Sequence, residues 1–256
     1  MPSRRQTIVL GRLAILVAVV LAWEALSRLG LVRTFWISSP SLIAARFAEL
    51  AGQGEFWFHV YVTLSEAFSG LVAGGAVGIA LGLLVGVSRT AGPILEPFVI
   101  ALNSLPRVAL GPLLVLYVGI GFASKFLLAF SLVVVPVMLN TYEGIRSVDQ
   151  TLVNVMRTLQ ATRAQLFFKL LLPNAVPWIL SAMRGAVSFA IVGAIVGEFI
   201  SAQAGIGFLI DEASGSFDTT GIMVPLLVLM ALGYALDCAI VAASRRLLRW
   251  RTLQLN

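Results

Sequence analysis

Six long apolar segments, separated by short polar stretches, run through this chain of 256 residues. Hydrophobic residues make up 59% of it and charged residues only 12%, whereas roughly a quarter of a soluble domain is charged. Because about 20 consecutive apolar residues cross a bilayer as a helix, we expect an all-α polytopic membrane protein. The expected transmembrane helices cover residues 9–29, 61–87, 98–118, 126–142, 175–200 and 222–243.

The distribution of basic residues predicts the orientation. If both termini lie on one side, twelve basic residues flank the spans on that side and only four flank them on the other. Because Lys and Arg accumulate next to the cytoplasmic ends of spans, we expect a multi-pass inner-membrane protein with both termini in the cytoplasm. This gives a cytoplasmic tail at 1–8, one transmembrane domain at 9–243 and a basic cytoplasmic tail at 244–256. The net charge of +6 without a soluble basic face argues against nucleic-acid binding.

A polar and basic segment at 144–173 separates the fourth and fifth spans, and the orientation places it in the cytoplasm. Ser147 with Gln150, and Thr162 with Gln165, have the hydroxyl-x-x-Gln spacing of a helix capping box. We therefore expect two short amphipathic helices that meet near residues 160–162, the second ended by Pro173. A structured surface of this kind is typical of a contact with a soluble partner.

Glycine and proline mark two of the spans. Five glycines at a strict spacing of four form a ridge that lets a neighbouring helix approach closely, namely Gly70, Gly74, Gly78, Gly82 and Gly86. Pro106 and Pro112 interrupt the third span, and the backbone carbonyls they leave free are tolerated only beside protein or a water-filled cavity. This span is a candidate for lining a translocation path, with Arg107 either on that path or reaching the interface.

Arg184 and Glu198 are charged residues within the fifth span. They share a helix face but lie roughly 21 Å apart along the axis, so they cannot pair with each other. Each requires another partner or an aqueous cavity, and both a path role and a structural role stay open. The chain shows no phosphate-binding G-x-x-x-x-G-K-[ST] motif and no cluster of metal ligands. We therefore expect no cofactor, no metal and no enzymatic activity of its own.

Segment 144–173 resembles the cytoplasmic coupling loop of ABC importer permeases, which opens with Glu-Ala-Ala and ends in hydrophobic-x-Leu-Pro. Aligned on Pro173, the Glu position falls on Asn154 and a following Gly position falls on Gln160, so both depart from the motif. The resemblance implies that this loop docks on an ATPase subunit. The residues implied in that contact are Asn154, Arg157, Thr158, Leu159, Gln160, Ala161, Thr162 and Pro173.

Further stretches are similar to the nitrate, sulfonate and taurine branch of these permeases. They are Ser39-Pro40-Ser41, Gly54 and His59, Thr63-Leu64 and Gly70, the third span from Leu105-Pro106 to Pro112, Gly119-Ile-Gly121, Lys125, Arg184, Gly197-Glu198-Phe199 and Gly205-Ile-Gly207. One position departs from the pattern, since Glu66 stands where the branch usually carries Arg. The resemblance implies a type I importer fold, with Pro106, Arg107, Pro112, Arg184 and Glu198 as candidate path or gating residues.

By the same resemblance, the chain is the membrane-spanning permease of an importer for a small organic or inorganic oxyanion such as a sulfonate, taurine or nitrate. The implied partners are two cytoplasmic ATPase subunits, a second permease copy and an extracytoplasmic substrate-binding protein that docks across the loops expected at 30–60 and 201–220. We expect a homodimer whose axis lies near the glycine ridge or near the third and fifth spans. A permease for a pyrimidine precursor and an ATP-independent transporter or channel stay open as alternatives.

Overall fold

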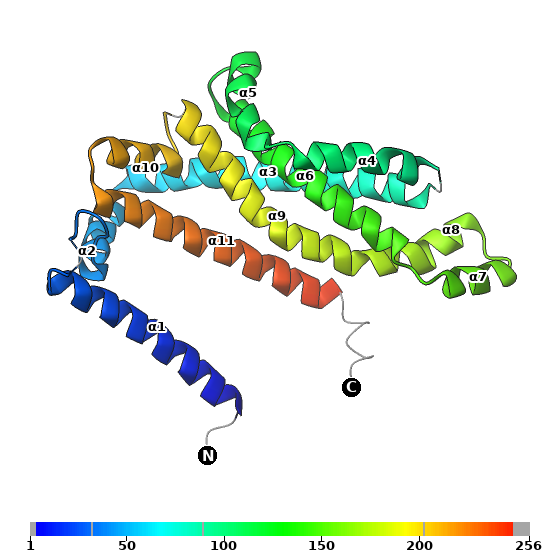
Figure 1. Ribbon diagram of the computed structural model, residues 1–256, viewed down its shortest axis with the longest axis horizontal. Helices are drawn as coiled ribbons and strands as arrows, with labels where there is room; N and C mark the ends of the chain where they lie inside the picture. Colours follow the sequence, from blue (N-terminus) through cyan, green and yellow to red (C-terminus); the bar gives the residue numbers. More distant parts are fainter. Residues whose placement is uncertain (1–3, 32, 89, 202, 248–256) are drawn as a thin grey trace.

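The computed structural model describes residues 4–31, 33–88, 90–201 and 203–247, and every regular element within these ranges is helical (Figure 1). Among the described residues, five helices are long and apolar enough to cross a membrane, or six if one bent pair counts as a single span. The expected all-α membrane fold is confirmed. The elements are α1 (Arg4–Arg28), α2 (Pro40–Ala51), α3 (Gly54–Val87), α4 (Ala91–Ser104), a 3₁₀ turn η1 (Arg107–Leu110), α5 (Gly111–Val118), α6 (Phe122–Arg146), α7 (Gln150–Thr158), α8 (Arg163–Leu166), a π turn η2 (Phe167–Leu171), α9 (Leu172–Ser201), α10 (Ile206–Gly215) and α11 (Thr219–Leu247).

The helices run further than the expected spans. α1 already begins at Arg4, within the expected tail, and α3 begins at Gly54 rather than near residue 61. Hydropathy marks only the part of a helix that crosses the hydrocarbon, while its backbone hydrogen bonds continue into polar residues. Most of the expected tail at 244–256 lies outside the described residues, as do Arg89, Arg249 and Arg251.

The third expected span consists of two helices. α4 ends at Ser104, and the segment from η1 through α5 is bent by 75° from it. Leu105 has the extended backbone that a residue before proline prefers, so the expected interruption at Pro106 is confirmed. Pro112 does not interrupt a helix, because it lies in the first turn of α5, where a missing amide hydrogen has no cost.

The centre of the bundle is the packing of α3, α6 and α9 (Figure 1). The five ridge glycines of α3 all face α6. A Cβ at Gly70 would lie 2.5 Å from the Cβ of Ala129, and one at Gly78 would lie 2.6 Å from the carbonyl oxygen of Val134. The missing side chains therefore set the close approach of these two helices.

The glycine ridge is thus occupied within one chain. Val137 and Ile145 of α6 continue the same contact, facing Gly78 and Gly86. The ridge therefore serves packing within one chain. Both expected positions of the dimer axis, near the ridge or near the third and fifth spans, stay predictions.

α1 lies apart from the bundle for most of its length, as Figure 1 shows. Along that length, its apolar side chains are therefore not covered by other helices of the same chain. The C-terminal end of α1 lies close to α2. The indole of Trp23 donates to the carbonyl oxygen of Ser38 at 2.7 Å, and Glu24 accepts from the backbone and hydroxyl of Ser41. These contacts hold α1 to the start of α2, which Ser39 caps.

Two expectations about connecting segments are wrong. Residues 201–220 contain the helix α10 instead of forming only a loop, because their apolar residues pack beside α3 and α11; Ile206 and Ile210 are buried there. The second short helix of segment 144–173 does not end at Pro173. The chain passes from α8 through the π turn η2 into α9, and Pro173 lies in the first turn of α9, where proline is tolerated.

Candidate functional site

Segment 144–173 projects from one end of the bundle as α7 and α8 (Figure 1). Asp149 caps α7, accepting a 2.8 Å hydrogen bond from the backbone N–H of Thr151. This bond lowers the pKa of the Asp149 carboxyl, because it favours the charged form. The expected cap at Ser147 is wrong, since α6 continues to Arg146 and Ser147 keeps helical backbone angles as its C-cap.

Between α7 and α8 the chain reverses direction at Gln160, which has a φ of 55°. This left-handed conformation normally favours glycine, and Gln160 stands at the glycine position of the coupling motif. Two residues later the expected capping box is confirmed. Thr162 Oγ1 accepts from the N–H of Gln165, whose Oε1 accepts from the N–H of Thr162 at 2.9 Å.

α7 turns an apolar stripe away from the chain. The side chains of Leu152, Val155 and Leu159 are 50%, 50% and 72% exposed, while Val153 is buried against the bundle. Most of the residues expected to contact an ATPase are exposed as well, and Ala161 and Pro173 are half-buried; the exposed ones are Asn154, Arg157, Thr158, Leu159, Gln160 and Thr162. α7 is therefore held on one side and presents both apolar and basic side chains on the other.

Residues at the junction of α6 and α9 tie this segment to the spans. The side-chain amide of Asn174 donates to the carbonyl oxygen of Gly144 at 2.9 Å and to Ser147 Oγ at 3.1 Å. A Cβ at Gly144 would lie 2.8 Å from that of Trp178. The ends of α6 and α9 are thus joined closely where segment 144–173 begins and ends.

Arg107 lies at the break between α4 and α5. One of its Nη atoms donates to the carbonyl oxygen of Ser131 in α6 at 2.6 Å, and the other donates to Asn103 Oδ1 at 2.8 Å. The guanidinium thereby links the broken span to α6. These two hydrogen bonds use two of the five N–H donors of the guanidinium. They support a structural role, and the remaining donors could bind an anion, so both roles are compatible with this geometry.

Arg184 and Glu198 have separate partners, as the distance between them requires. Arg184 pairs with Asp237 of α11, with 2.9 Å between Nε and Oδ1. Glu198 is 2% exposed and lies at the opposite end from α7, where its carboxylate accepts from Thr63 Oγ1 at 2.6 Å and from the N–H of Gly207 at 2.5 Å.

The connection from α9 to α10 is built around Glu198. Three successive backbone N–H groups of this connection donate to side chains: Gly205 to His59 Nδ1 at 2.9 Å, Ile206 to Thr63 Oγ1 at 2.7 Å and Gly207 to Glu198. Gly205 has a φ of 120°, and a Cβ there would collide with the Glu198 carboxylate. Sequence reasoning missed the roles of His59 and Thr63, although the Gly-Ile-Gly signal was visible.

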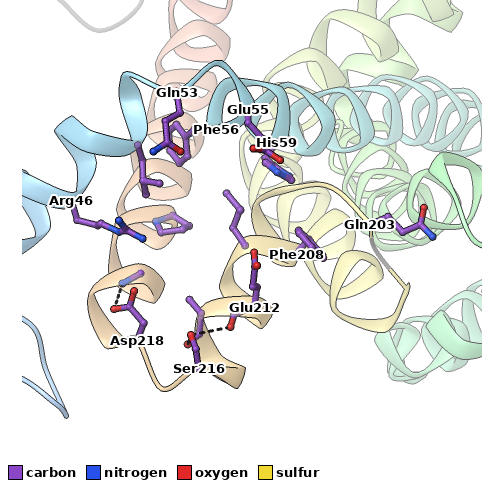
Figure 2. Close-up of a pocket in the computed structure, with 15 residues that line it drawn as sticks. Arg46, Gln53, Glu55, Phe56, His59, Gln203, Phe208, Glu212, Ser216 and Asp218 are labelled. Carbon is purple, nitrogen blue, oxygen red and sulfur yellow. Dashed lines mark hydrogen bonds between the residues drawn. The ribbon is translucent and has the colours of Figure 1, made fainter.

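A cleft of about 550 Å³ opens beside this connection, between α2, the start of α3, α10 and the start of α11 (Figure 2). Three acidic side chains and one arginine, Glu55, Glu212, Asp218 and Arg46, line it together with His59 and Phe208. The cleft is therefore more acidic than basic. Apart from Gly221 and Pro225, its lining residues lie within 30–60 and 201–220, the two segments expected to dock a binding protein.

Comparison with protein families matches residues 74–253 to the "Binding-protein-dependent transport system inner membrane component". Among similar proteins is a putative aliphatic sulfonates transport permease, SsuC, of Bacillus subtilis, 32% identical over 93% of this chain and 86% of its own length. The taurine transport system permease TauC of Escherichia coli is 29% identical over 97% of this chain and 91% of its own. The formylaminopyrimidine transport permease ThiX of Halalkalibacterium halodurans is 32% identical over 91% and 92%.

Solved structures agree on the fold. A structure of the MetNI methionine ABC transporter in an inward-facing conformation matches with a TM-score of 0.63, at 21% identity, over 75% of this chain and 93% of its own. An amino acid ABC transporter matches with a TM-score of 0.60 at 16% identity, over 81% and 97%. The arrangement of helices is thus that of type I ABC importer permeases.

Proposed function

Because the chain belongs to the family of binding-protein-dependent transport system inner-membrane components, we propose that it is the permease of an ABC importer for a small organic or inorganic oxyanion. Sulfonates, taurine and nitrate are the expected substrates, as its sequence is similar to aliphatic sulfonate and taurine permeases over more than nine tenths of its length. The observation that carries the proposal is this similarity together with the exposed, capped segment at 144–173.

Segment 144–173 is the proposed contact with a cytoplasmic ATPase, one ATPase subunit for each permease copy. The exposed stripe on α7 and the nearby Arg157 offer such a partner an apolar and basic surface. Closure of the ATPase on ATP would drag this segment and, through the junction at Asn174, move α6 and α9. To shift the permease almost completely from one state to the other, the ATPase must bind the favoured permease state more tightly, by a binding free energy of about 5.5 kcal/mol.

Two permease copies are proposed to form the path, as two ATPase subunits would act on two such segments. Pro106, Arg107 and Pro112 at the broken span, with Arg184 and Glu198 of α9, remain the proposed path and gating residues. The cation of Arg107 supports passage of an anion, because a positive charge within a span is favourable to negatively charged substrates.

The cleft between α2 and α10 is the proposed docking place of an extracytoplasmic binding protein. It lies at the opposite end from segment 144–173 (Figures 1 and 2), and its acidic residues suit a partner with basic side chains. The chain would then lie in the inner membrane, with both termini and segment 144–173 in the cytoplasm.

A pyrimidine precursor is the second candidate substrate, since the formylaminopyrimidine permease is as similar in sequence as the sulfonate permease. Vesicles that contain this chain with the ATPase and binding protein encoded nearest to it would be loaded with ATP and offered labelled taurine, an alkanesulfonate, nitrate or formylaminopyrimidine. We expect ATP-dependent uptake of a sulfonate or taurine. Uptake of the pyrimidine alone would change the substrate, and uptake that proceeds unchanged without the ATPase would indicate a channel instead.

A further inference from the structure

Three charged side chains from three helices meet at the end of the bundle beside α10. Glu66 of α3, Lys125 of α6 and Glu198 of α9 are only 1%, 5% and 2% exposed. With both glutamates ionised, this cluster would hold one uncompensated negative charge away from water. Such a charge is costly in a protein interior, so the cluster requires one further positive charge.

Glu198 has the surroundings of a carboxylate. It accepts hydrogen bonds from Thr63 and from the N–H of Gly207, as described above, and both bonds favour its charged form. It also lies at the first turn of α10, where the helix dipole attracts a negative group. Glu198 is therefore the ionised member of the two glutamates.

Glu66 has different surroundings. Its Oε1 is 3.7 Å from Lys125 Nζ, which is too far for a hydrogen bond, and its buried Oε2 has no hydrogen-bond partner among the described residues. Glu66 also interacts electrostatically with Glu198, which accepts from Thr63, one turn earlier than Glu66 on α3. Two neighbouring buried carboxylates repel each other, whereas one carboxyl group and one carboxylate attract each other through a shared proton.

We propose that Glu66 and Glu198 bind one proton between them, carried by Glu66 and donated to Glu198, so that the cluster with Lys125 is neutral. The proton makes Glu66 neutral, which removes the cost of a second buried charge and gives its side chain a donor. It also leaves Lys125 to balance the charge of Glu198 alone. This proton site goes beyond transport of an oxyanion and does not depend on the substrate.

Space and charge favour a proton over a metal or ammonium ion. A Cβ at Gly207 would lie 2.7 Å from Glu198 Oε2, and one at Gly197 would lie 2.8 Å from Lys125 Cγ, so the groups are closely packed. The neighbouring pocket, lined by Glu66, Lys125, Tyr61, Ser65 and Gln203, gives a route for protons from solvent. Lys125 on the wall of that pocket would repel a larger cation.

The other groups around the pair leave this charge balance unchanged. On α3, His59 is occupied by the α9–α10 connection, since its Nδ1 accepts from the N–H of Gly205. Residues 205–210 of the α10 side carry no titratable side chain, and on α5 Tyr117 is 80% exposed. When the proton leaves, Glu66 and Glu198 repel each other and α3 loses attraction to the α9–α10 connection.

Infrared spectroscopy of the purified chain in lipid, without ATPase or binding protein, tests the site directly. At neutral pH we expect the C=O band of a protonated carboxyl group, shifted in heavy water and lost on titration to alkaline pH. Absence of that band at neutral pH would overturn the proposal. Suppression of the band by sodium, potassium or ammonium ions at constant pH would also overturn it, because a cation would then be the natural occupant.

Two variants assign the band. Glu66→Gln keeps a donor for Glu198 and should abolish the band, while Glu49→Gln, at an exposed glutamate of α2 paired with Arg46, should leave it unchanged. If Glu66→Gln does not fold, Glu66→Asp should shift the band in frequency. A band that neither change affects would place the proton elsewhere and refute the assignment. Since no transport is measured, this result is independent of the proposed function.

Discussion

Arg184 and Asp237 join α9 to α11 through two hydrogen bonds, Nε to Oδ1 at 2.9 Å and Nη2 to Oδ2 at 3.1 Å. The two residues are 53 positions apart in the chain and lie within two candidate membrane spans. A two-point contact of this kind fixes the relative rotation of two helices as well as their distance. Both side chains are partly exposed on the chain's surface, and the described part of α11 buries few residues, such as Val224 and Leu229, so this pair adds to a small contact between α9 and α11.

Removal of one partner of this pair should destabilise the chain more than removal of both. Arg184→Ala and Asp237→Ala each leave an unpaired charge within the span, whereas the double variant leaves none. We expect each single variant to lower the melting temperature in detergent by a few degrees, and the double variant to lower it by less than the sum. Strictly additive losses would mean that the two side chains do not stabilise each other.

The glycine ridge predicts a contrast between two glycines. Gly78→Ala places a Cβ 2.6 Å from the carbonyl oxygen of Val134, so α3 and α6 must separate, at a cost of about 1–3 kcal/mol. Gly185→Ala on α9 meets nothing within 4 Å and should be neutral or slightly stabilising. Equilibrium unfolding of both variants in mixed micelles measures the difference. Equal stability of the two would show that the ridge does not control the helix approach.

Substitutions on α7 test the proposed ATPase contact. Leu159→Asp and Arg157→Glu change exposed side chains, so both variants should insert and fold normally but lose co-purification with the ATPase, by about tenfold or more if either residue is a hot spot. Phe217→Asp is a matched control, because Phe217 is 74% exposed but lies between α10 and α11. Normal ATPase association of both α7 variants would place the contact elsewhere on the chain.

The cap of α7 predicts a local dependence on pH. The pKa of Asp149 is depressed in the folded chain, so its contribution is complete above the ordinary Asp pKa of about 3.9 and is lost as pH falls through the lower folded value. Amide exchange at residues 151–153, corrected for the intrinsic effect of pH, should accelerate over that acidic range. Asp149→Asn keeps an acceptor without a charge, so its exchange should lack this acidic transition; an identical transition in Asp149→Asn would exclude the carboxyl as its source.

Labelling of single cysteines tests the orientation. The single natural cysteine is first replaced, Cys238→Ala. In spheroplasts, whose inner membrane is intact, a membrane-impermeant maleimide should then label Ser216→Cys. Thr158→Cys should react only after the membrane is opened, since the positive-inside rule puts α7 in the cytoplasm. The reverse pattern would separate α7 from any cytoplasmic ATPase and contradict the proposed mechanism.

Much of the fold could be predicted from local sequence. The spans follow from apolar length, and the capping box at Thr162 follows from residues only three positions apart. The break at Pro106 follows from the chemistry of a single residue. Such features depend on neighbours along the chain, which a sequence displays directly.

Contacts between distant helices were harder to predict. The sequence shows that Arg184 needs a partner but cannot name Asp237, because the choice depends on how α9 and α11 are rotated against each other. Lys125 lies just before the expected fourth span at 126–142, yet α6 begins at Phe122 and turns this side chain inward towards Glu66. The short helix at Pro173 was misjudged because proline in a first helical turn does not end a helix.

The unbroken helical path from α8 through η2 into α9 has a mechanical consequence. Residues 163–201 form a rod of about 58 Å, with the α7 side at one end and Glu198 close to the other. A stiff rod transmits displacement along its length, and this one can yield most readily at the π turn and at Pro177. A force applied beside α7 would therefore displace Glu198, whose carboxylate accepts the hydrogen bond from Gly207 at the start of α10.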